Sequence, residues 1–527
     1  MPAPLRTVPR RGCRFGGVLL TAAVWVLAPG CTPEAPPDAS PLAPAAPAAP
    51  RPALPDLSAP GPVVAAGPLV VLVSWDTTRA DALGAYADVS HWGLDLPTSV
   101  HPTPHTPTAD ALAARGVRFQ WALAHAPTTL NSHTSIFSGQ DPHGHRVPRN
   151  GYPVPEDVPL LAERFSGAGW DTIGVVGASV LATDMGLSRG FRVYDDAVGT
   201  QVRRRFEDPA DRVMQRTLAA VDARPNAEAP LFLFVHNFDA HSPWDTAPAD
   251  VRAQIMRDDY RGVVDGGDAS MDVLIQGMRG GVLPAEDRAQ GRAAYLAEVS
   301  FADQQLGVLL TALQQRGYQQ DVLVVLVGDH GETLDEIPAR PYQHGFDVDL
   351  VDIHVPFILA GTGRFDVPQA QVVPRLVSLR DVAPTVLGLA GVPGGIGDGV
   401  DLRDAWLPPG SVAPPPPPHF AEATKPSVRE ETNGWNNLPF ARSVAHDGHF
   451  LRSALILGER ASLHRLAAGQ PAVPATESSA GTQAALRALL VAWDAAAPGF
   501  RAVQMSPQTK EGLRALGYLE EQKPAEP

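Results

Sequence analysis

The sequence predicts an α/β fold, in which a doubly wound, mostly parallel sheet carries helices on both faces and is followed by a smaller C-terminal α+β subdomain. Continuous apolar runs recur along the chain, which is typical of strands buried on both faces of a parallel sheet. Helical patterns separate these runs, and this alternation indicates the doubly wound class. A chain of 527 residues, 44% of them hydrophobic, can bury a core of that size.

Five apolar runs are the predicted strands. They read "PLVVLVSWD" (68–76), "DTIGVVGAS" (171–179), "PLFLFVHNFD" (230–239), "DVLVVLVGDHGE" (321–332) and "VPFILAG" (355–361). The predicted helices between and around them cover 108–115, 158–168, 209–223 and 286–316. Because ligands of such folds gather at the carboxyl ends of the strands, the polar residues that follow each run are the candidates for function.

The N-terminus resembles a bacterial lipoprotein signal over residues 1–31. A basic leader precedes the apolar run 16–27, and "LAPGC" ends it at Cys31. A plain cleaved signal peptide, an uncleaved anchor and twin-arginine export remain alternatives. Residues 32–66 are dominated by Pro and Ala and predict an extended linker. We therefore expect an exported protein of the bacterial cell envelope, periplasmic or on the outer surface, with a lipid anchor to the membrane at Cys31.

Charge and cysteine content exclude several classes of function. The net charge of −15 and the pI near 5.5 argue against nucleic acid as a partner, since phosphate contacts need clustered Lys and Arg. An acidic protein can still bind an anion where a metal ion supplies positive charge. Cys13 and Cys31 both precede the predicted folded region, so it has no disulfide and no cysteine-based metal site.

Carboxylates and histidines follow three of the predicted strands. Side chains of these types that converge from separate strand ends are what a divalent cation site requires. Each by itself could instead be a helix cap, a turn former or a structural histidine. The residues are Asp76, Asp239, His241, Asp329, His330 and, shortly after, His344.

Several blocks together resemble the sulfatase family of the alkaline phosphatase superfamily. They are "VLVSWDTTRADALGAY", "APTTLNSHTSIFSG", "GFRVYDD", "FLFVHNFDAHSPW" and "GDHGETLDE" with "HGFDVDLVDIHVPFILAG", in the family's order and spacing. The similarity covers about residues 67–395, and "VSLRDVAPTVLGLAGVP" and "LRALGYLE" resemble the family's C-terminal region. The resemblance implies the same α/β fold and ester hydrolysis with a divalent metal.

The resemblance also implies roles for single residues. One metal ion would be held by the Asp after the first strand, the nucleophile and the Asp-His pair, which match Asp76, Thr129, Asp329 and His330. Relatives with two metals suggest Asp239, His241 and His344 for a second ion, whereas one-metal sulfatases use the corresponding His to contact the sulfate. We expect one or two ions of zinc, calcium or manganese, with Asp239 and His344 as metal ligands and His241 as a substrate-binding residue.

Thr129 departs from the sulfatase pattern. Sulfatases carry Cys or Ser in a C/S-X-P-S-R arrangement and oxidise it to formylglycine, whereas this chain reads Thr129-Leu130-Asn131-Ser132-His133. Threonine cannot give that aldehyde, and the Lys-X-His element of many sulfatases is absent. Formylglycine is therefore not expected.

A metal-bound threonine hydroxyl offers another route to the same reaction. Its lowered pKa would make an alkoxide nucleophile available, and attack would form a covalent Thr129 ester. A helix from Ser132 would help to hold the anion, and His133 is a candidate to orient the anion or protonate the leaving group. The alternatives are that Thr129 only caps the helix and that His133 only packs or caps it.

The remaining segments complete the predicted organisation. The catalytic domain spans 67–406, and a Gly- and Asp-rich insertion at 245–283 suggests a lid or specificity loop. Residues 407–515 form a Pro-rich linker and a C-terminal subdomain with short strands and a helix from Gln483 to Ala496, and 516–527 form a tail. Lys425 could reach the cleft and bind substrate.

The predicted function is hydrolysis of sulfate or phosphate esters by a metal-dependent, sulfatase-like enzyme. The predicted enzyme class is a sulfuric or phosphoric ester hydrolase. Phosphodiesterase and phosphotransferase activity are two further possibilities within that prediction. A non-catalytic surface lipoprotein that binds anionic glycans or lipid head groups is the alternative. The physiological substrate and the oligomeric state stay open.

Overall fold

The structure is a computed structural model of the 527-residue chain. It describes residues 66–90, 102–198, 206–406, 415–424, 441–454, 461–475, 480–499 and the single positions 507 and 511. The predicted signal segment 1–31 with Cys31, nearly all of the linker 32–66, Lys425 and the tail 516–527 lie outside the described residues. Those assignments, and the domain boundaries drawn from them, stay predictions.

A nine-stranded sheet forms the centre of the fold. Five of its strands coincide with the predicted apolar runs, and the other four were not predicted. Its strand order is β4-β3-β5-β1-β6-β8-β2-β7, with β9 paired to β2. The strands β1, β3, β4, β5 and β6 run parallel, whereas β8 is antiparallel to β6. The strands are β1 Leu69–Trp75, β2 Val117–Leu123, β3 Asp171–Val176, β4 Val193–Asp195, β5 Leu231–Asn237, β6 Val322–Gly328, β7 His354–Val355, β8 Phe357–Gly361 and β9 Gln371–Ser378.

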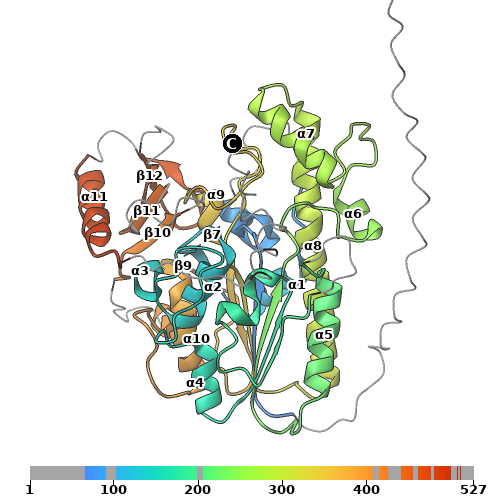
Figure 1. The fold of residues 1–527 in the computed structure, drawn as a ribbon, viewed down its shortest axis with the longest axis vertical. Helices are drawn as coiled ribbons and strands as arrows, with labels where there is room; N and C mark the ends of the chain where they lie inside the picture. Colours follow the sequence, from blue (N-terminus) through green and yellow to red (C-terminus); the bar gives the residue numbers. More distant parts are fainter. Residues whose placement is uncertain are drawn as a thin grey trace, which may run out of the picture. The chain divides into compact units, whose positions relative to one another are not determined.

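Helices cover both faces of this sheet, which confirms the doubly wound class (Figure 1). One face carries α1 Pro107–Arg115, α5 Ala210–Asp222 and α8 Ala285–Gln315; the other carries α2 Thr129–Ser138, α4 Leu161–Gly167 and α10 Val382–Ala390. Shorter helices are α3 Pro142–His145 and α9 Leu350–Ile353. The 3-10 turns are η1 Ala80–Ala82, η2 Gly84–Val89, η4 Ser179–Leu181, η5 Thr183–Met185, η6 Leu379–Asp381 and η7 Leu402–Trp406.

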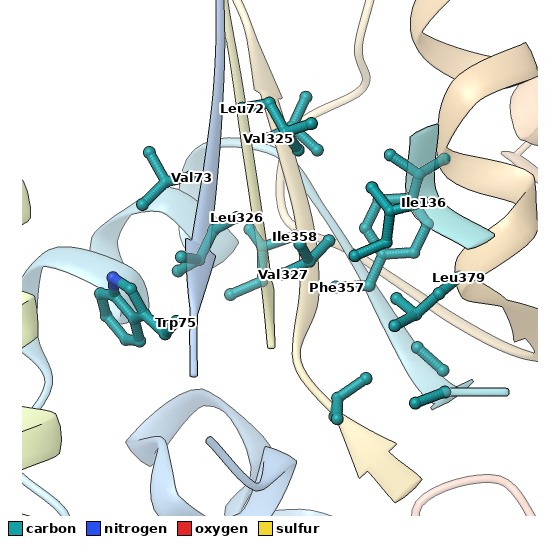
Figure 2. Packing of buried hydrophobic residues seen from close by; sticks show 14 of the residues in the cluster. Leu72, Val73, Trp75, Ile136, Val325, Leu326, Val327, Phe357, Ile358 and Leu379 are labelled. Atoms are coloured by element: carbon teal, nitrogen blue, oxygen red, sulfur yellow. The ribbon is translucent and has the colours of Figure 1, made fainter. Parts of the chain in front are cut away.

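The core lies between the sheet and these helices. Every residue of β1 is buried, which is why its sequence is a continuous apolar run and does not alternate. Figure 2 shows Leu72 of β1 and Val325 of β6 in this core, together with Ile136 of α2. Full burial of such an aliphatic side chain contributes roughly 1.5–3 kcal/mol to folding. The core thereby fixes the strand ends and α2 relative to each other.

One predicted helix begins later than its pattern indicates. The prediction for 158–168 starts at Val158, but α4 starts at Leu161. Pro159 restricts the residue before it to extended backbone, so Val158 cannot join the helix. The helix therefore begins only after the proline.

The insertion at 245–283 contains two helices, α6 Ala249–Ile255 and α7 Asp268–Arg279. Val251 of α6 packs against Ala297 and Phe301 of α8. The insertion is thus anchored on the long helix, and a role as a lid or specificity loop stays a prediction. Within the described part of the chain, no helix has the length and apolar character needed to cross a bilayer.

The C-terminal subdomain is an antiparallel sheet with one helix packed on it, as predicted, with two further strands. Leu486, Leu490 and Trp493 form one stripe of the helix and contact Val444 and Leu451 of the sheet. Its elements are β10 His419–Ala423, β11 Ala441–His446, β12 His449–Ala454, β13 Ser462–Arg465, β14 Val473–Pro474 and α11 Ala480–Ala495.

Candidate metal centre and nucleophile

The carboxyl ends of β5, β1 and β6 bring the predicted site together. In the sheet β1 lies between the other two, and Trp75 is in register with both Asn237 and Gly328. Asp76 and Asp329 are the next residues of their strands, and their backbone N–H groups donate to Asn237 O at 3.0 Å and Trp75 O at 3.3 Å. The two carboxylates therefore start from adjacent positions at one edge of the sheet.

Asp76, Asp329 and His330 form a compact group of possible metal ligands. One ligand atom of each lies within 4.8 Å of the other two, and all three side chains are buried. His330 Nε2 is 3.8 Å from Asp76 Oδ1 and 3.6 Å from Asp329 Oδ2. The prediction that these three residues converge is met by this geometry.

The unpaired atoms in this group fit a divalent cation. Asp329 Oδ2 and His330 Nε2 make no hydrogen bond to any described residue, although a buried polar atom without a partner costs about 1–3 kcal/mol. His330 Nδ1 is 2.9 Å from Gly331 O and must donate to it, which leaves the lone pair on Nε2. Two carboxylate oxygens, an imidazole nitrogen and a nearby hydroxyl are a common donor set for such an ion.

Burial raises the pKa of both aspartates. Burial raises the pKa of Asp76, against the opposing influence of His330 and His241. Burial also holds the pKa of Asp329 well above its usual range, and the nearby Asp76 carboxylate raises it further. Because a bound cation favours the charged form of both groups, it would reverse these shifts.

Thr129 is the first residue of α2, and it does not cap that helix. The N-cap is Thr128, so the alternative in which Thr129 is the cap is wrong. Thr128 Oγ1 donates to Asn131 Oδ1 at 2.6 Å, and the same oxygen accepts from Ser132 N at 3.0 Å. The helix therefore begins three residues before the predicted start.

The Thr129 hydroxyl lies beside the metal group. Thr129 is completely buried. Its hydroxyl is one of the groups that lower the pKa of Asp76, so the two side chains face each other. The site therefore combines a hydroxyl and three possible metal ligands.

His133 lies one turn after Thr129 on α2 and is completely buried. Its Nδ1 donates to Thr129 O at 2.8 Å and lies 3.5 Å from Asp329 Oδ2. Burial and the neighbouring His236 hold the pKa of His133 well below its usual value. The structure brings His133 to the site, and its predicted catalytic role stays a proposal.

His236 is a site residue that sequence reasoning missed. Its Nε2 lies 3.2 Å from Asp76 Oδ2, and burial lowers its pKa to about 3. The signal in the sequence is a lone histidine near the end of the apolar run "LFLFVHN". A polar residue at that position in a doubly buried strand needs a partner, which here is Asp76.

Asn150 is a second residue that the sequence did not reveal. Its Oδ1 accepts from the backbone N–H of Leu130 at 2.7 Å, next to Thr129, and its Nδ2 has no hydrogen-bond partner among the described residues. No motif marks it, because the contact joins α2 to a loop twenty residues further along the chain. Its amide places a donor at the start of the helix.

His241 and His344 lie beside His330. The ring centroids of His241 and His344 are 4.9 Å apart, and those of His330 and His344 are 4.8 Å apart. His344 Nδ1 is 3.0 Å from Glu332 Oε2, and His241 Nδ1 is 2.8 Å from Ser242 O. Both predicted residues therefore border the site.

Asp239 has a different environment from the one predicted for a metal ligand. Its Oδ1 accepts from Thr246 Oγ1 at 3.0 Å. Burial, with the nearby Glu298 carboxylate as the second cause, raises its pKa well above the usual value. Across the part of the chain that the structure describes, the compact ligand groups include neither Asp239 nor His344.

The sequence was compared with protein families and with curated proteins. The sulfatase family model matches residues 68–392. An ulvan-active sulfatase of Formosa agariphila is 24% identical over 400 residues, which cover 71% of this chain and 70% of that protein. An endo-4-O-sulfatase of Bacteroides thetaiotaomicron is 32% identical over 110 residues, 20% of each chain.

Solved structures show the same fold. A structure of a protein in complex with its substrate D-glucosamine-2-N,6-O-disulfate has a TM-score of 0.58 at 15% identity and covers 82% of this chain and 98% of its own. The phosphonate monoester hydrolase of Agrobacterium radiobacter has a TM-score of 0.58 at 18% identity, with 82% and 96% covered. At such low sequence identities, the similarity shows only that these proteins share the fold.

Proposed function

The chain belongs to the sulfatase family and is a hydrolase of ester bonds, and from that premise we propose that it hydrolyses sulfate or phosphate esters with Thr129 as the nucleophile. One observation carries the proposal. The Thr129 hydroxyl is completely buried and faces the Asp76 carboxylate, next to the group of possible metal ligands formed by Asp76, Asp329 and His330. A threonine that only shaped the helix would not need that position.

The residues that would hold the metal are Asp76, Thr129, Asp329 and His330. A divalent ion bound there would lower the pKa of the Thr129 hydroxyl and offset the charge of both carboxylates. Zinc, calcium and manganese are the candidates, since the donors are mostly oxygen with one imidazole.

Thr129 Oγ would attack the sulfur or phosphorus atom of the substrate. The new bond to Thr129 forms as the bond to the leaving oxygen breaks, the hydroxyl proton passes to solvent, and the leaving alcohol takes a proton from water. Water then hydrolyses the Thr129 ester, which restores the hydroxyl and releases sulfate or phosphate. Threonine has no route to the formylglycine aldehyde, so the attacking atom is the side-chain oxygen itself.

Other residues would bind the anionic group. The unpaired Nδ2 of Asn150 lies at the start of α2, and His241 lies beside His344. In this proposal both side chains would donate to substrate oxygens. Lys425 remains a candidate outside the described residues. Its preceding residue, Thr424, donates from Oγ1 to Pro148 O at 2.6 Å, close to Asn150 in the sequence.

Two observations bear on the substrate. The matched relatives include sulfatases named for ulvan and for 4-O-sulfate, which supports a sulfated saccharide. Thr129 in place of the Cys or Ser of sulfatases favours a phosphate or phosphonate ester, and one structural neighbour is a phosphonate monoester hydrolase. Family membership therefore favours hydrolysis of sulfate esters. The threonine nucleophile favours hydrolysis of phosphate or phosphonate esters.

Parallel assays would decide between these substrates. The purified protein, its Thr129→Ala variant and its Thr129→Ser variant are given aryl sulfate, aryl phosphate, aryl phosphonate and phosphodiester substrates. We expect turnover by the wild type and by Thr129→Ser, none by Thr129→Ala, and an unmodified residue 129 in the peptide mass spectrum. Full activity of Thr129→Ala, or an aldehyde at residue 129, would refute the mechanism.

A further inference from the structure

A second group of possible metal ligands lies next to the first. It consists of His133 of α2, His236 of β5 and Asp329, each with one ligand atom within 4.8 Å of the other two. We propose that this group is a second divalent-cation site, which shares Asp329 with the site of the proposed function. It rests on that function through the shared aspartate and through the negative charge of the ionised Thr129 and the ester. The two histidines themselves belong to neither the nucleophile nor the first ligand group.

Three separate elements hold the three side chains in place. The His133 and His236 rings are perpendicular, with centroids 4.9 Å apart. His133 also contacts the edge of Phe234, which packs on Phe137 of the same helix. The apolar surroundings leave the histidines little freedom to turn away from the aspartate.

The histidines have unused lone pairs in this position. His133 Nδ1 donates to Thr129 O, so the lone pair lies on Nε2, which has no hydrogen-bond partner in the described residues. His236 Nε2 is 3.2 Å from Asp76 Oδ2, and its Nδ1 is likewise without a partner there. Buried imidazoles normally satisfy both nitrogens, so two such neighbours indicate a shared ligand.

The charges at the site also favour a second cation. Within the described residues, the ion-pair contacts of Asp76 and Asp329 are all with histidines, and none is with Lys or Arg. One divalent ion balances these two carboxylates. An ionised Thr129 and an anionic ester group would then add negative charge to a buried region, which a second ion would balance.

The donor set determines the kind of ion. Two imidazole nitrogens and one carboxylate oxygen suit zinc or a neighbouring transition metal, whereas calcium and magnesium prefer oxygen ligands. The group formed by Asp76, Thr129, Asp329 and His330 is richer in oxygen. The second site should therefore take zinc and reject calcium.

Metal content separates the two sites without any assay of activity. The full chain is stripped with a chelator, saturated with zinc, freed of excess metal and analysed for bound metal per chain. We expect two ions in the wild type, one in His236→Ala, one in His133→Ala and one in Asp76→Asn. His449→Ala in the C-terminal sheet is the control and should keep two.

Cobalt and calcium give an independent measurement on the unmodified protein, should a variant fail to fold. Cobalt bound to two imidazoles absorbs in the visible range, and excess calcium should displace at most the cobalt in the oxygen-rich site. If the wild type, His133→Ala and His236→Ala each hold one ion, the second site does not exist, whereas the first site is unaffected. A wild type without any ion would refute both.

Discussion

Arg452 of β12 and Asp347, in the loop after β6, form a buried two-pronged ion pair. Arg452 Nε donates to Asp347 Oδ1 at 2.6 Å, and Nη2 donates to Oδ2. Arg340 contacts the same Asp347 at 2.9 Å and Asp352 at 2.9 Å. The C-terminal sheet is thereby fixed to the loop that carries His344.

Replacement of Arg452 by alanine should lower the free energy of unfolding. It leaves Asp347 partly uncompensated in a buried position, and loss of one partner of a buried pair costs up to about 3–5 kcal/mol. Denaturant unfolding measures the loss, and a double-mutant cycle with Asp347→Asn should show coupling between the two residues. Arg257→Ala, which removes the exposed pair with Asp259, is the control and should change nothing measurable. An equally small effect at Arg452 would contradict the structural role.

Substitution of Thr129 should separate chemistry from folding. We expect Thr129→Ala to lose roughly 10³-fold or more of kcat, since removal of a nucleophile leaves only binding and electrostatic effects. Thr129→Ser keeps the hydroxyl and should retain activity. A rapid acid quench followed by intact mass should detect the ester on the wild type alone. Equal rates for the alanine and serine variants would exclude the nucleophile.

Metal removal should destabilise the protein. Binding of an ion to the folded state alone stabilises it by about 2.7 kcal/mol at a concentration one hundred times Kd. A chelator should therefore lower Tm of the wild type, and added zinc or manganese should restore it. In Asp329→Asn, which alters a ligand of both proposed sites, the chelator should have a much smaller effect. An unchanged wild-type Tm would argue against a bound ion.

Glu298 on α8 should make stability depend on pH. Burial raises its pKa to about 7, although it accepts hydrogen bonds from the backbone of Thr246 and Ala247 at 3.0 Å. Because the folded state binds this proton more tightly than the unfolded state, the protonated acid contributes fully to stability below the ordinary pKa of 4.5. That contribution is lost as pH rises to about 7.

The variant Glu298→Gln mimics the protonated acid and should remove this slope. Unfolding free energies of wild type and variant, measured from pH 4 to 8, should diverge in favour of the variant as pH rises. Glu286→Gln, at an exposed position of the same helix, serves as the control. Parallel curves for Glu298→Gln and wild type would show that the carboxylate does not titrate in this window.

The proposed lipid anchor depends on one cysteine. Cys31→Ser should shift the full-length protein from the membrane fraction to the soluble fraction of the cell envelope, since the lipid chains would be attached to that sulfur. Fractionation with a lipid-label incorporation assay measures both effects. Membrane retention without any lipid label would favour an uncleaved anchor.

The middle strands of the central sheet and the core of the site follow from the amino-acid pattern. The runs of β1, β5 and β6 are apolar throughout because burial on both faces demands it, and parallel neighbours end at one edge. Asp76, Asp329 and His330 follow those ends directly, so the strand pattern and the family resemblance both pointed to them.

Which polar atoms meet across separate elements depends on how the chain packs. His236 pairs with Ser74 in the register of β5 on β1, and its side chain reaches diagonally to Asp76, two residues further along. Asn150 reaches Leu130 through a loop without any pattern. Asp239 contacts Thr246 because the chain after β5 turns toward α8. Such contacts depend on register and chain reversal, which local composition does not encode, so they follow from the packed fold alone.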